Sequence, residues 1–227
     1  MSGWAANKAV AGLLLAVLLA GCGPSPLWDQ PAVGRHVVRS GETLYTIAWR
    51  YGRDYRDLAR WNRLGDGSLI YPGQVILLNP PAAAGGASSP SRPAATKPAP
   101  RPQPPPPWEW PTRGPVIAEF TGGSGSGTGL VIGGRAGQAV RAAAAGRVVY
   151  SGGGLIGYGQ LIILKHNDTY LSAYGHNASL LVAEGDNIKK GQRIATMGEG
   201  PGQEPRLHFE IRRNGKPVNP RQYLPAR

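Results

Sequence analysis

The apolar positions of residues 36–78 follow first a strand pattern and then a helical period. Val37 and Val38 begin a short strand. Apolar residues then recur three and four positions apart, which predicts a helix with one buried face. The residues of this face are Leu44, Ile47, Ala48 and Tyr51. Gly52 follows directly and is placed to end the helix in a left-handed conformation.

A second helix is expected immediately afterwards. Asp54, with Asp57 three residues later, can cap its start, and Leu58 and Trp61 would lie on its buried face. A Tyr-Pro-Gly turn at 71–73 leads into a returning strand at 74–78. The predicted order is therefore strand, helix, helix, strand.

The pattern changes to mainly antiparallel β-structure from residue 108 onward. Short apolar stretches alternate with glycine-rich turns, and long helical periods are missing. The stretches are 116–117, 130–132, 147–150, 161–164, 170–174 and 207–211. The chain is thus predicted to be multidomain, with a small α+β domain at 36–79 and a β domain at 108–227.

Residues 80–107 separate the two predicted domains. They include eleven prolines, the basic residues Arg92, Lys97 and Arg101, and no acidic residue, so they cannot form an apolar core. A semi-rigid spacer is the favoured interpretation, and a ligand for an SH3-like domain is the alternative. Fully extended, such a spacer reaches up to roughly 85 Å.

The first 21 residues are predicted to be a signal peptide. Lys8 is their only charged side chain, and the apolar run at 9–20 is shorter than the roughly 20 residues that cross a bilayer. Cys22, the only cysteine, follows directly and leaves no disulfide possible within the chain. The Leu-Ala-Gly-Cys sequence at 19–22 resembles the lipobox of bacterial lipoproteins. The resemblance implies a diacylglycerol on Cys22, a tether at 22–35 and, since Gly23 is not Asp, the outer membrane.

The positive net charge of the chain favours anionic partners. The formal charge is +12, and removal of Lys8 with the signal peptide leaves 24 basic and 13 acidic residues, a balance of about +11. A basic protein often binds nucleic acid, but an exported lipoprotein meets little of it. Anionic lipids and the carboxylates of cell-wall peptides are the expected partners, and no nucleic acid is expected.

The predicted α+β domain resembles the LysM module. The similarity rests on Ser-Gly-Glu-Thr-Leu at 40–44, Ile47-Ala48, Tyr51-Gly52 and Ile-Tyr-Pro-Gly-Gln at 70–74. LysM modules bind the glycan of peptidoglycan in a shallow groove between two loops. The residues implied for that groove are Gly41, Glu42, Thr43, Leu44, Ile70, Tyr71, Pro72 and Gly73. Trp49 and Trp61 are expected to pack rather than to contact sugar, and His36 has no evident role.

The β domain resembles the LytM-type zinc metallopeptidases, whose duplicated-hybrid-motif fold the similarity implies. It spans the whole domain and includes Gly-Tyr-Gly at 157–159, Tyr-Gly-His at 174–176 and Arg-Leu-His-Phe-Glu-Ile at 206–211. A lipoyl or biotinyl carrier domain is the weaker alternative. Such a domain needs a modifiable lysine at a hairpin tip within a short motif of its own, and the sequence has no such motif. The order lipobox, LysM, linker, LytM is similar to the NlpD-type murein hydrolase activators.

The residues that would hold zinc are largely absent. Active LytM-type enzymes use a His-x-x-x-Asp motif and the second His of His-x-His, which gives three protein ligands and an open position. His208 occupies the third ligand position, but Gly127 and Val131 fall where the first His and the Asp should be, and Arg206 replaces the other His. Arginine cannot bind a metal or accept a proton. No metal, no cofactor and no catalysis are expected, with His176 and His208 as vestiges.

The resemblance implies an activator rather than an enzyme. The chain would bind peptidoglycan and activate a periplasmic N-acetylmuramoyl-L-alanine amidase for septal cell-wall splitting. The residues assigned to the partner surface are Tyr174, His176, Arg206 and His208. A structural tether between the outer membrane and the wall is one alternative, and an active zinc endopeptidase is the least favoured.

Overall fold

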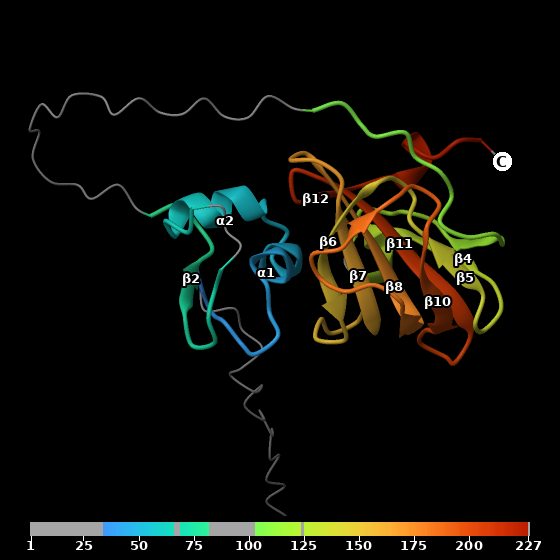
Figure 1. The fold of residues 1–227 in the computed structure, drawn as a ribbon, viewed down its shortest axis with the longest axis horizontal. Coiled ribbons are helices and arrows are strands. Elements are labelled where there is room, and N and C mark those ends of the chain that lie inside the picture. Colours follow the sequence, from blue (N-terminus) through green and yellow to red (C-terminus); the bar gives the residue numbers. More distant parts are fainter. Residues whose placement is uncertain (1–33, 66–68, 82–102, 124, 227) are drawn as a thin grey trace, which may run out of the picture. The chain divides into compact units, whose positions relative to one another are not determined.

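The computed structural model describes residues 34–65, 69–81, 103–123 and 125–226 (Figure 1). All of these residues belong to one compact unit. Cys22, the signal peptide and most of the spacer lie outside the described residues. Among the described residues, no helix has the length and apolar character needed to cross a membrane.

Residues 34–81, called the N-terminal domain below, fold in the predicted order of strand, helix, helix and strand. The elements are β1 (Arg35–Val37), α1 (Leu44–Arg50), α2 (Tyr55–Trp61) and β2 (Val75–Leu77). The two strands pair antiparallel, with His36 opposite Ile76. Both helices pack their apolar faces on the strands around a core that contains Leu44, Ile47, Leu58 and Ile76.

Local signals in the sequence set the ends of both helices. Thr43 caps α1 by accepting the N–H of Thr46, whose own hydroxyl accepts the N–H of Thr43. Gly52 follows α1 with φ +58°, the left-handed conformation predicted for it. Asp54 caps α2 and accepts the N–H of Arg56, as expected.

Residues 103–226, called the C-terminal domain below, form a ten-stranded, antiparallel sheet that folds over its own core (Figure 1). The strands are β3 (Val116–Ala118), β4 (Leu130–Gly133), β5 (Ala139–Arg141), β6 (Gly146–Gly152), β7 (Gln160–Lys165), β8 (Tyr170–Leu180), β9 (Asn187–Ile188), β10 (Arg193–Glu199), β11 (Pro205–Arg213) and β12 (Lys216–Val218). Two short 3-10 helices, η1 (Gly125–Thr128) and η2 (Pro220–Gln222), complete it. The predicted mainly antiparallel β fold is confirmed.

The central path of the sheet runs β3-β4-β11-β10-β8-β7-β6-β9. Strand β11 lies between β4 and β8, and it alternates strictly. Leu207, Phe209 and Ile211 enter the main core of the domain. The polar residues between them therefore face the opposite side of the sheet.

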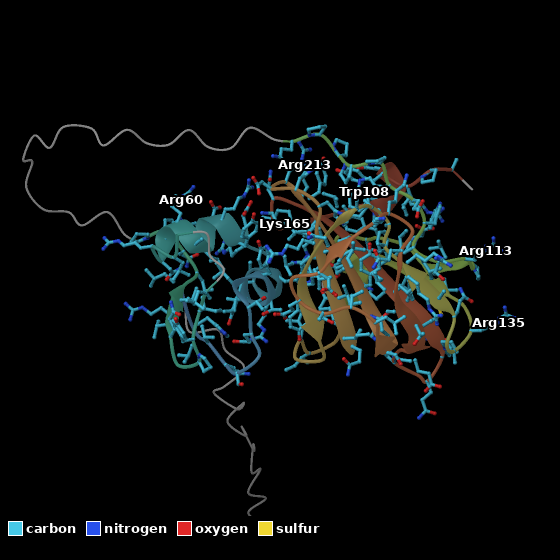
Figure 2. The ribbon with its side chains drawn as sticks, viewed as in Figure 1. Arg60, Trp108, Arg113, Arg135, Lys165 and Arg213 are labelled. Carbon is cyan, nitrogen blue, oxygen red and sulfur yellow. The ribbon has the colours of Figure 1, made fainter. Side chains whose placement is uncertain are left out.

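Basic side chains are spread over the surface of both domains. Figure 2 labels Arg60, Arg113, Arg135 and Arg213, which come from separate elements and are all exposed. Their separation means that the positive charge gives a general attraction to anionic polymers and surfaces rather than one mapped site.

Candidate functional site

The polar face of β11 carries a buried carboxylate. Glu210 is 0% exposed and receives four hydrogen bonds. His208 Nε2 lies 2.8 Å and the Tyr158 hydroxyl 2.7 Å from its Oε1, and the Thr128 hydroxyl also donates to Oε1, at 2.5 Å. Arg212 Nε donates to Oε2 at 3.0 Å. Oε1 of this carboxylate therefore accepts from three protein donors and Oε2 from one.

These bonds keep Glu210 ionised. Burial by itself would raise the pKa of Glu210, because a charge loses its hydration in the interior. The hydrogen bond from His208 and the positive charge of Arg212 act in the other direction and outweigh burial, so the pKa lies below its ordinary value. The result is a closed His-Glu-Arg network, which we call the β11 triad (His208, Glu210, Arg212).

The β11 triad occupies the place where zinc ligands would be required. Strand β11 pairs with β4 so that His208 lies directly opposite Val131. Directly opposed residues of antiparallel strands lie on the same face of the sheet. The Asp expected beside this histidine in an active peptidase is thus a valine, and Nε2 of His208 is already bonded to Glu210.

The remaining ligand position is also unsuitable. Gly127 lies in η1, and a Cβ atom added there would come within 2.4 Å of the Thr121 hydroxyl oxygen, so a histidine would require movement. Within the described residues, no group of three or more His, Cys, Asp or Glu side chains is placed to hold a metal ion. The donor set present does not fit a catalytic zinc centre.

Two partly exposed nitrogen-containing side chains, His176 and Arg206, border the β11 triad. The His176 ring lies 6.2 Å from the His208 ring, and Arg206 adds a permanent positive charge nearby. Burial, then His208, then Arg206 lower the pKa of His176. Arg206 Nη2 bonds Glu204 at 2.6 Å, while its Nε is buried with no hydrogen-bond partner among the described residues. His176, Arg206 and His208 are therefore brought together, as alternation on the strand predicted.

The backbone of His176 is unusual. Its φ of +60° lies in the left-handed region, which only a few per cent of non-glycine residues occupy. The His176 N–H donates to the Tyr158 carbonyl at 2.8 Å, which helps to hold that conformation. Residues kept in such conformations concentrate at functional sites.

The assignment of Tyr174 to the partner surface is wrong. Its side chain is 0% exposed and packs on Phe209 with ring centroids 5.5 Å apart. Its hydroxyl accepts the Ala143 N–H at 2.8 Å and lies 2.9 Å from the Ser172 hydroxyl. Burial raises the pKa of Tyr174 to about 12. The first part of β8 is covered on both faces, so alternation along this strand does not identify an outer face.

The N-terminal domain contains a second triad of the same composition, His36, Glu42 and Arg50, which we call the loop triad. Glu42 Oε2 lies 2.6 Å from His36 Nε2, and its Oε1 lies 2.6 Å from Arg50 Nη1. The Arg39 N–H donates to the same carboxylate at 2.9 Å. Burial opposes ionisation, but the bonds from Arg39 and His36 outweigh it and lower the pKa of Glu42. His36, for which no role was evident from its sequence context, thus braces the loop.

The two loops of the expected glycan groove lie next to each other. The Gly73 N–H donates to the Val38 carbonyl and the Val38 N–H to the Gln74 carbonyl, both at 2.8 Å, which joins the 70–74 turn to the strand leading into the 39–43 loop. Tyr71 is 60% exposed and available to a ligand. Leu44 is only 1% exposed, so its expected contact with sugar is wrong: as the first residue of α1 it enters the domain core.

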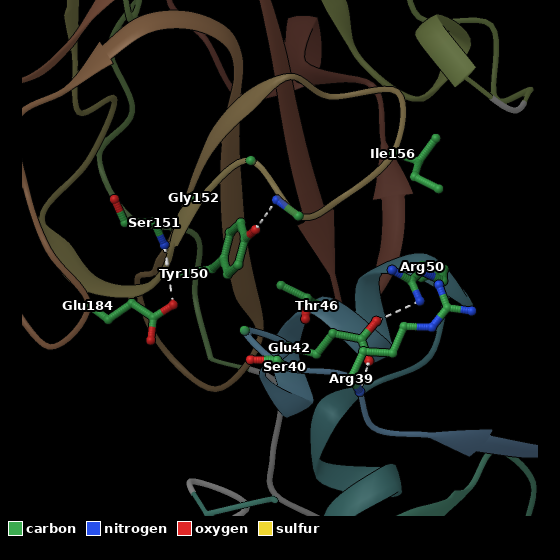
Figure 3. Close-up of a pocket in the computed structure, with 13 residues that line it drawn as sticks. Arg39, Ser40, Glu42, Thr46, Arg50, Tyr150, Ser151, Gly152, Ile156 and Glu184 are labelled. Atoms are coloured by element: carbon green, nitrogen blue, oxygen red, sulfur yellow. Dashed lines mark hydrogen bonds and ion pairs between the residues drawn. The ribbon is translucent and has the colours of Figure 1, made fainter. Parts of the chain in front are cut away.

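A cleft of about 370 Å³ lies beside the loop triad (Figure 3). One wall is formed by Arg39, Ser40, Gly41, Glu42, Thr46 and Arg50, and the other by residues 150–154, Ile156 and Glu184 of the C-terminal domain. The Tyr150 hydroxyl accepts the Gly154 N–H at 2.8 Å and fixes the turn that follows β6. Gly41 and Glu42, both expected in the glycan groove, therefore face this cleft.

Sequence reasoning missed Glu210, Arg212, Tyr158 and His36 as site residues. A signal was present for the first two, because they continue the alternation from Arg206 and His208 along one face of β11. A run of four charged or polar residues on one face of a central strand requires a covering element. Tyr158 and His36 carried no such signal, since their partners lie in other elements: Glu210 of β11 and Trp49 of α1 for Tyr158, and Glu42 of the loop before α1 for His36.

Two protein families match this chain. The LysM domain model matches residues 36–79, and the model of peptidase family M23 matches residues 125–220. A lipoprotein NlpD/LppB homologue of Pseudomonas aeruginosa is 38% identical, and the match covers 95% of this chain and 91% of that protein. The murein hydrolase activator NlpD of Escherichia coli K12 is 39% identical over 85% of this chain and 68% of its own length. The lipoprotein YgeR of the same organism is 36% identical over 99% and 97%.

Proposed function

This chain belongs to the NlpD-type lipoproteins, which join a LysM domain to an M23-type domain, and we propose that it activates a periplasmic N-acetylmuramoyl-L-alanine amidase. In this proposal it binds peptidoglycan, cuts nothing itself and promotes septal cell-wall splitting. Cys22 carries the lipid that anchors it to the periplasmic face of the outer membrane. The spacer at 80–107 gives the C-terminal half its reach.

The β11 triad is the observation that carries the proposal. It keeps the strand of a zinc peptidase but uses His208 to bond Glu210, with Val131 opposite where an acidic ligand would be needed. A peptidase must polarise a scissile carbonyl, and this arrangement has no group for that task. The relatives named murein hydrolase activators support a role in which the scaffold is kept for binding.

The partner surface is proposed to centre on His176 and Arg206, with His208 beneath them. Both outer side chains are partly exposed and basic, so they favour an acidic or hydrogen-bonding surface on the enzyme. Activation requires that this surface bind the open form of the amidase more tightly than the closed form, since equal affinity would shift nothing.

Peptidoglycan binding is proposed for the two adjacent loops of the N-terminal domain. Gly41, Glu42 and Thr43 form one side, and Ile70, Tyr71, Pro72 and Gly73 form the other. The exposed Tyr71 ring offers an apolar face to a sugar, and backbone groups of the glycine-containing turns can bond N-acetyl groups. Binding here would place the C-terminal domain at its target, the cell wall.

The experiment is an amidase assay with dye-labelled peptidoglycan and the full-length chain in detergent. We expect the chain alone to release no dye and to stimulate the amidase, and Arg206→Ala to reduce that stimulation while the exposed control Arg135→Ala does not. Stimulation that survives deletion of residues 108–227 would remove the proposal. So would dye release by the chain alone together with one chelator-removable zinc per chain.

A structural tether between outer membrane and wall is the second candidate, favoured by the lipobox combined with the LysM domain. It requires no regulated partner. Deletion of the gene would then loosen the outer membrane from the wall without any defect in cell separation, whereas the activator proposal requires chains of unseparated cells.

A further inference from the structure

We propose that the N-terminal domain is a latch on the C-terminal domain, closed through Trp49, and that the latch must open before a partner reaches the surface around His176. The inference rests on the proposed function and adds a regulated state to it. It follows from four features: where Trp49 is buried, what holds it, what it touches next, and how the rest of the contact is built.

Trp49 is buried in the other domain rather than its own. It is the sixth residue of α1 and only 3% exposed, yet it does not belong to the core of the N-terminal domain. It packs instead in a cluster on the C-terminal domain. The other buried members of this cluster are Tyr150, Leu155, Leu161, Ile163, Leu171 and Ala173. A tryptophan with this much apolar area dominates the contact between two surfaces.

Arg212 of the β11 triad holds Trp49 in two ways. Its guanidinium carbon lies 3.6 Å from the centre of the indole ring, and its Nη1 donates to the Trp49 carbonyl at 2.7 Å. Both Trp49 and Arg212 are buried, so the cation–π contact is desolvated and strong for its kind. The same arginine bonds Glu210, which ties the latch directly to the triad.

Tyr158 carries the contact on to the proposed partner surface. Trp49 Nε1 donates to its hydroxyl at 3.1 Å, and that hydroxyl donates to Glu210. The Tyr158 ring lies 5.5 Å from the His208 ring, and its carbonyl accepts the N–H of His176. A helix is about 10–12 Å across with its side chains. A helical partner segment laid over His176 and His208 would therefore also meet Tyr158 and the Trp49 that covers it.

The rest of the contact is mostly polar, although Tyr45 of α1 also packs, partly buried, against the same cluster. Arg56 Nη2 donates to Asn214 Oδ1 at 3.0 Å, and the Tyr55 hydroxyl donates to Asp168 at 3.3 Å. Gly215 approaches the Arg53 carbonyl so closely that a Cβ atom would come within 2.2 Å of it. Exposed polar pairs of this kind contribute little to stability. One buried anchor with a weak polar border is the construction of a contact that opens.

Opening would also uncover an apolar face of the sheet, formed by the cluster that surrounds Trp49. Exposed patches of this kind mark protein-binding surfaces. The latch thus has two positions: closed, with the patch and Tyr158 covered, and open, with both free for a partner. Glu42 and Gly41 border the same junction across the cleft of Figure 3, so the wall-binding loop lies where the two domains meet.

The test is fluorine NMR of the full-length chain labelled with 5-fluorotryptophan. The chain has six tryptophans, and Trp49→Phe identifies the Trp49 signal. We expect this signal to resist broadening by a soluble gadolinium chelate. Leu155→Glu, which places a charge against the indole, should raise the open population roughly tenfold or more and broaden the signal. Ile117→Glu is the control, because Ile117 is 49% exposed, belongs to no buried cluster and does not line the cleft between the domains.

The signal of Trp108, which lies in the core of the C-terminal domain, checks that Leu155→Glu still folds. In the amidase assay at limiting activator, Leu155→Glu and Trp49→Ala should stimulate up to roughly tenfold more than the wild type, and Ile117→Glu should match the wild type. A wild-type Trp49 signal broadened as much as that of Leu155→Glu would overturn the latch. So would unchanged stimulation in a variant whose signal shows that it has opened. If neither the wild type nor the opened variants stimulate the amidase, the proposed function fails. The broadening of the Trp49 signal by the gadolinium chelate then decides by itself whether the domains are latched.

Discussion

The loop triad and the β11 triad have the same three residue types and opposite settings. In each, a glutamate lies between a histidine and an arginine, and in each the pKa of the glutamate is lowered. Glu42 is held by a loop and a helix close in sequence, and its arginine is a quarter exposed. Glu210 is held along one strand and by two distant loops, with no exposure.

The difference teaches what each triad is suited for. The Glu42 carboxylate, with local partners and an arginine that is a quarter exposed, braces a loop and can exchange its bonds with a ligand in the adjacent cleft. The fully enclosed Glu210 carboxylate, with four protein donors, cannot release its partners without a large cost. The β11 triad therefore holds His208 and Arg212 in one fixed arrangement, while the loop triad lies beside a cleft that a ligand could enter.

The largest expected effect is that of Glu210→Gln. It removes the charge that compensates buried Arg212, and breaking a buried pair in this way costs about 3–5 kcal/mol. Urea unfolding of the full-length chain, followed through the Trp108 fluorine signal, measures the loss. The control is Glu204→Gln on the same side of the domain, whose exposed pair with Arg206 should contribute less than about 1 kcal/mol. Equal urea midpoints for the two variants would mean that the buried triad contributes no more to stability than an exposed ion pair does.

Acidification from pH 7 to pH 4 should lower the free energy of unfolding of the C-terminal domain more than that of the N-terminal domain. Burial lowers the pKa of His166 to about 4, so the unfolded chain binds its proton more readily than the folded chain does. Stability of the C-terminal domain is then fully present above the unfolded value near 6.5, and falls by up to about 1.4 kcal/mol per pH unit down to about pH 4. Glu42 and Glu210, whose pKa values are lowered, reduce the free energy of unfolding only below about pH 4.5, where the unfolded chain begins to protonate them.

Urea midpoints measured at several pH values from 7 to 4, with Trp108 reporting on the C-terminal domain and Trp61 on the N-terminal domain, give the two slopes. His166→Gln should flatten the slope of the C-terminal domain alone. A steeper decline at Trp61 than at Trp108 in this range would contradict the assignment.

Glu42→Gln should cost less than Glu210→Gln. Its arginine is a quarter exposed and can turn to solvent, so we expect a loss of about 1–2 kcal/mol, the range for a hydrogen bond to a charged group. The Trp61 signal in urea measures it. Asp57→Asn, which breaks an exposed pair with Arg60, serves as the control and should stay within about 0.5 kcal/mol of the wild type. A loss as large as that of Glu210→Gln would erase the contrast between the triads.

Tyr71→Ala should leave stability unchanged and weaken glycan binding. The side chain is exposed, and an aromatic ring stacked on a ligand contributes about 0.5–1.5 kcal/mol, which is a factor of about 2–10 in affinity. Titration with an N-acetylglucosamine oligomer measures the change. Val75→Ala, an exposed apolar substitution on β2, should bind as the wild type does. Equal affinities for the two variants would place the sugar elsewhere.

Local patterns in the sequence were enough for the elements and for part of the site. Neighbouring residues determine the end of the first helix at Gly52, the cap of the second at Asp54 and the shared face of Arg206 and His208, so these features could be read directly. The contact between Trp49 and Arg212 joins residues 163 positions apart, and no periodicity encodes it. Tyr174 was misplaced for a related reason: where both faces of a strand are covered, apolar residues no longer distinguish inside from outside.

The sharing of Trp49 between the two domains has a consequence for chimeric proteins. A LysM domain taken from a relative would fold around its own core. Where its residue at position 49 is not tryptophan, it would bring a different side chain to the cluster on the C-terminal domain that surrounds Trp49 here. Such a hybrid would keep two folded domains and lose the specific contact between them. Compatibility at position 49, more than overall similarity, should decide which exchanges preserve regulated behaviour.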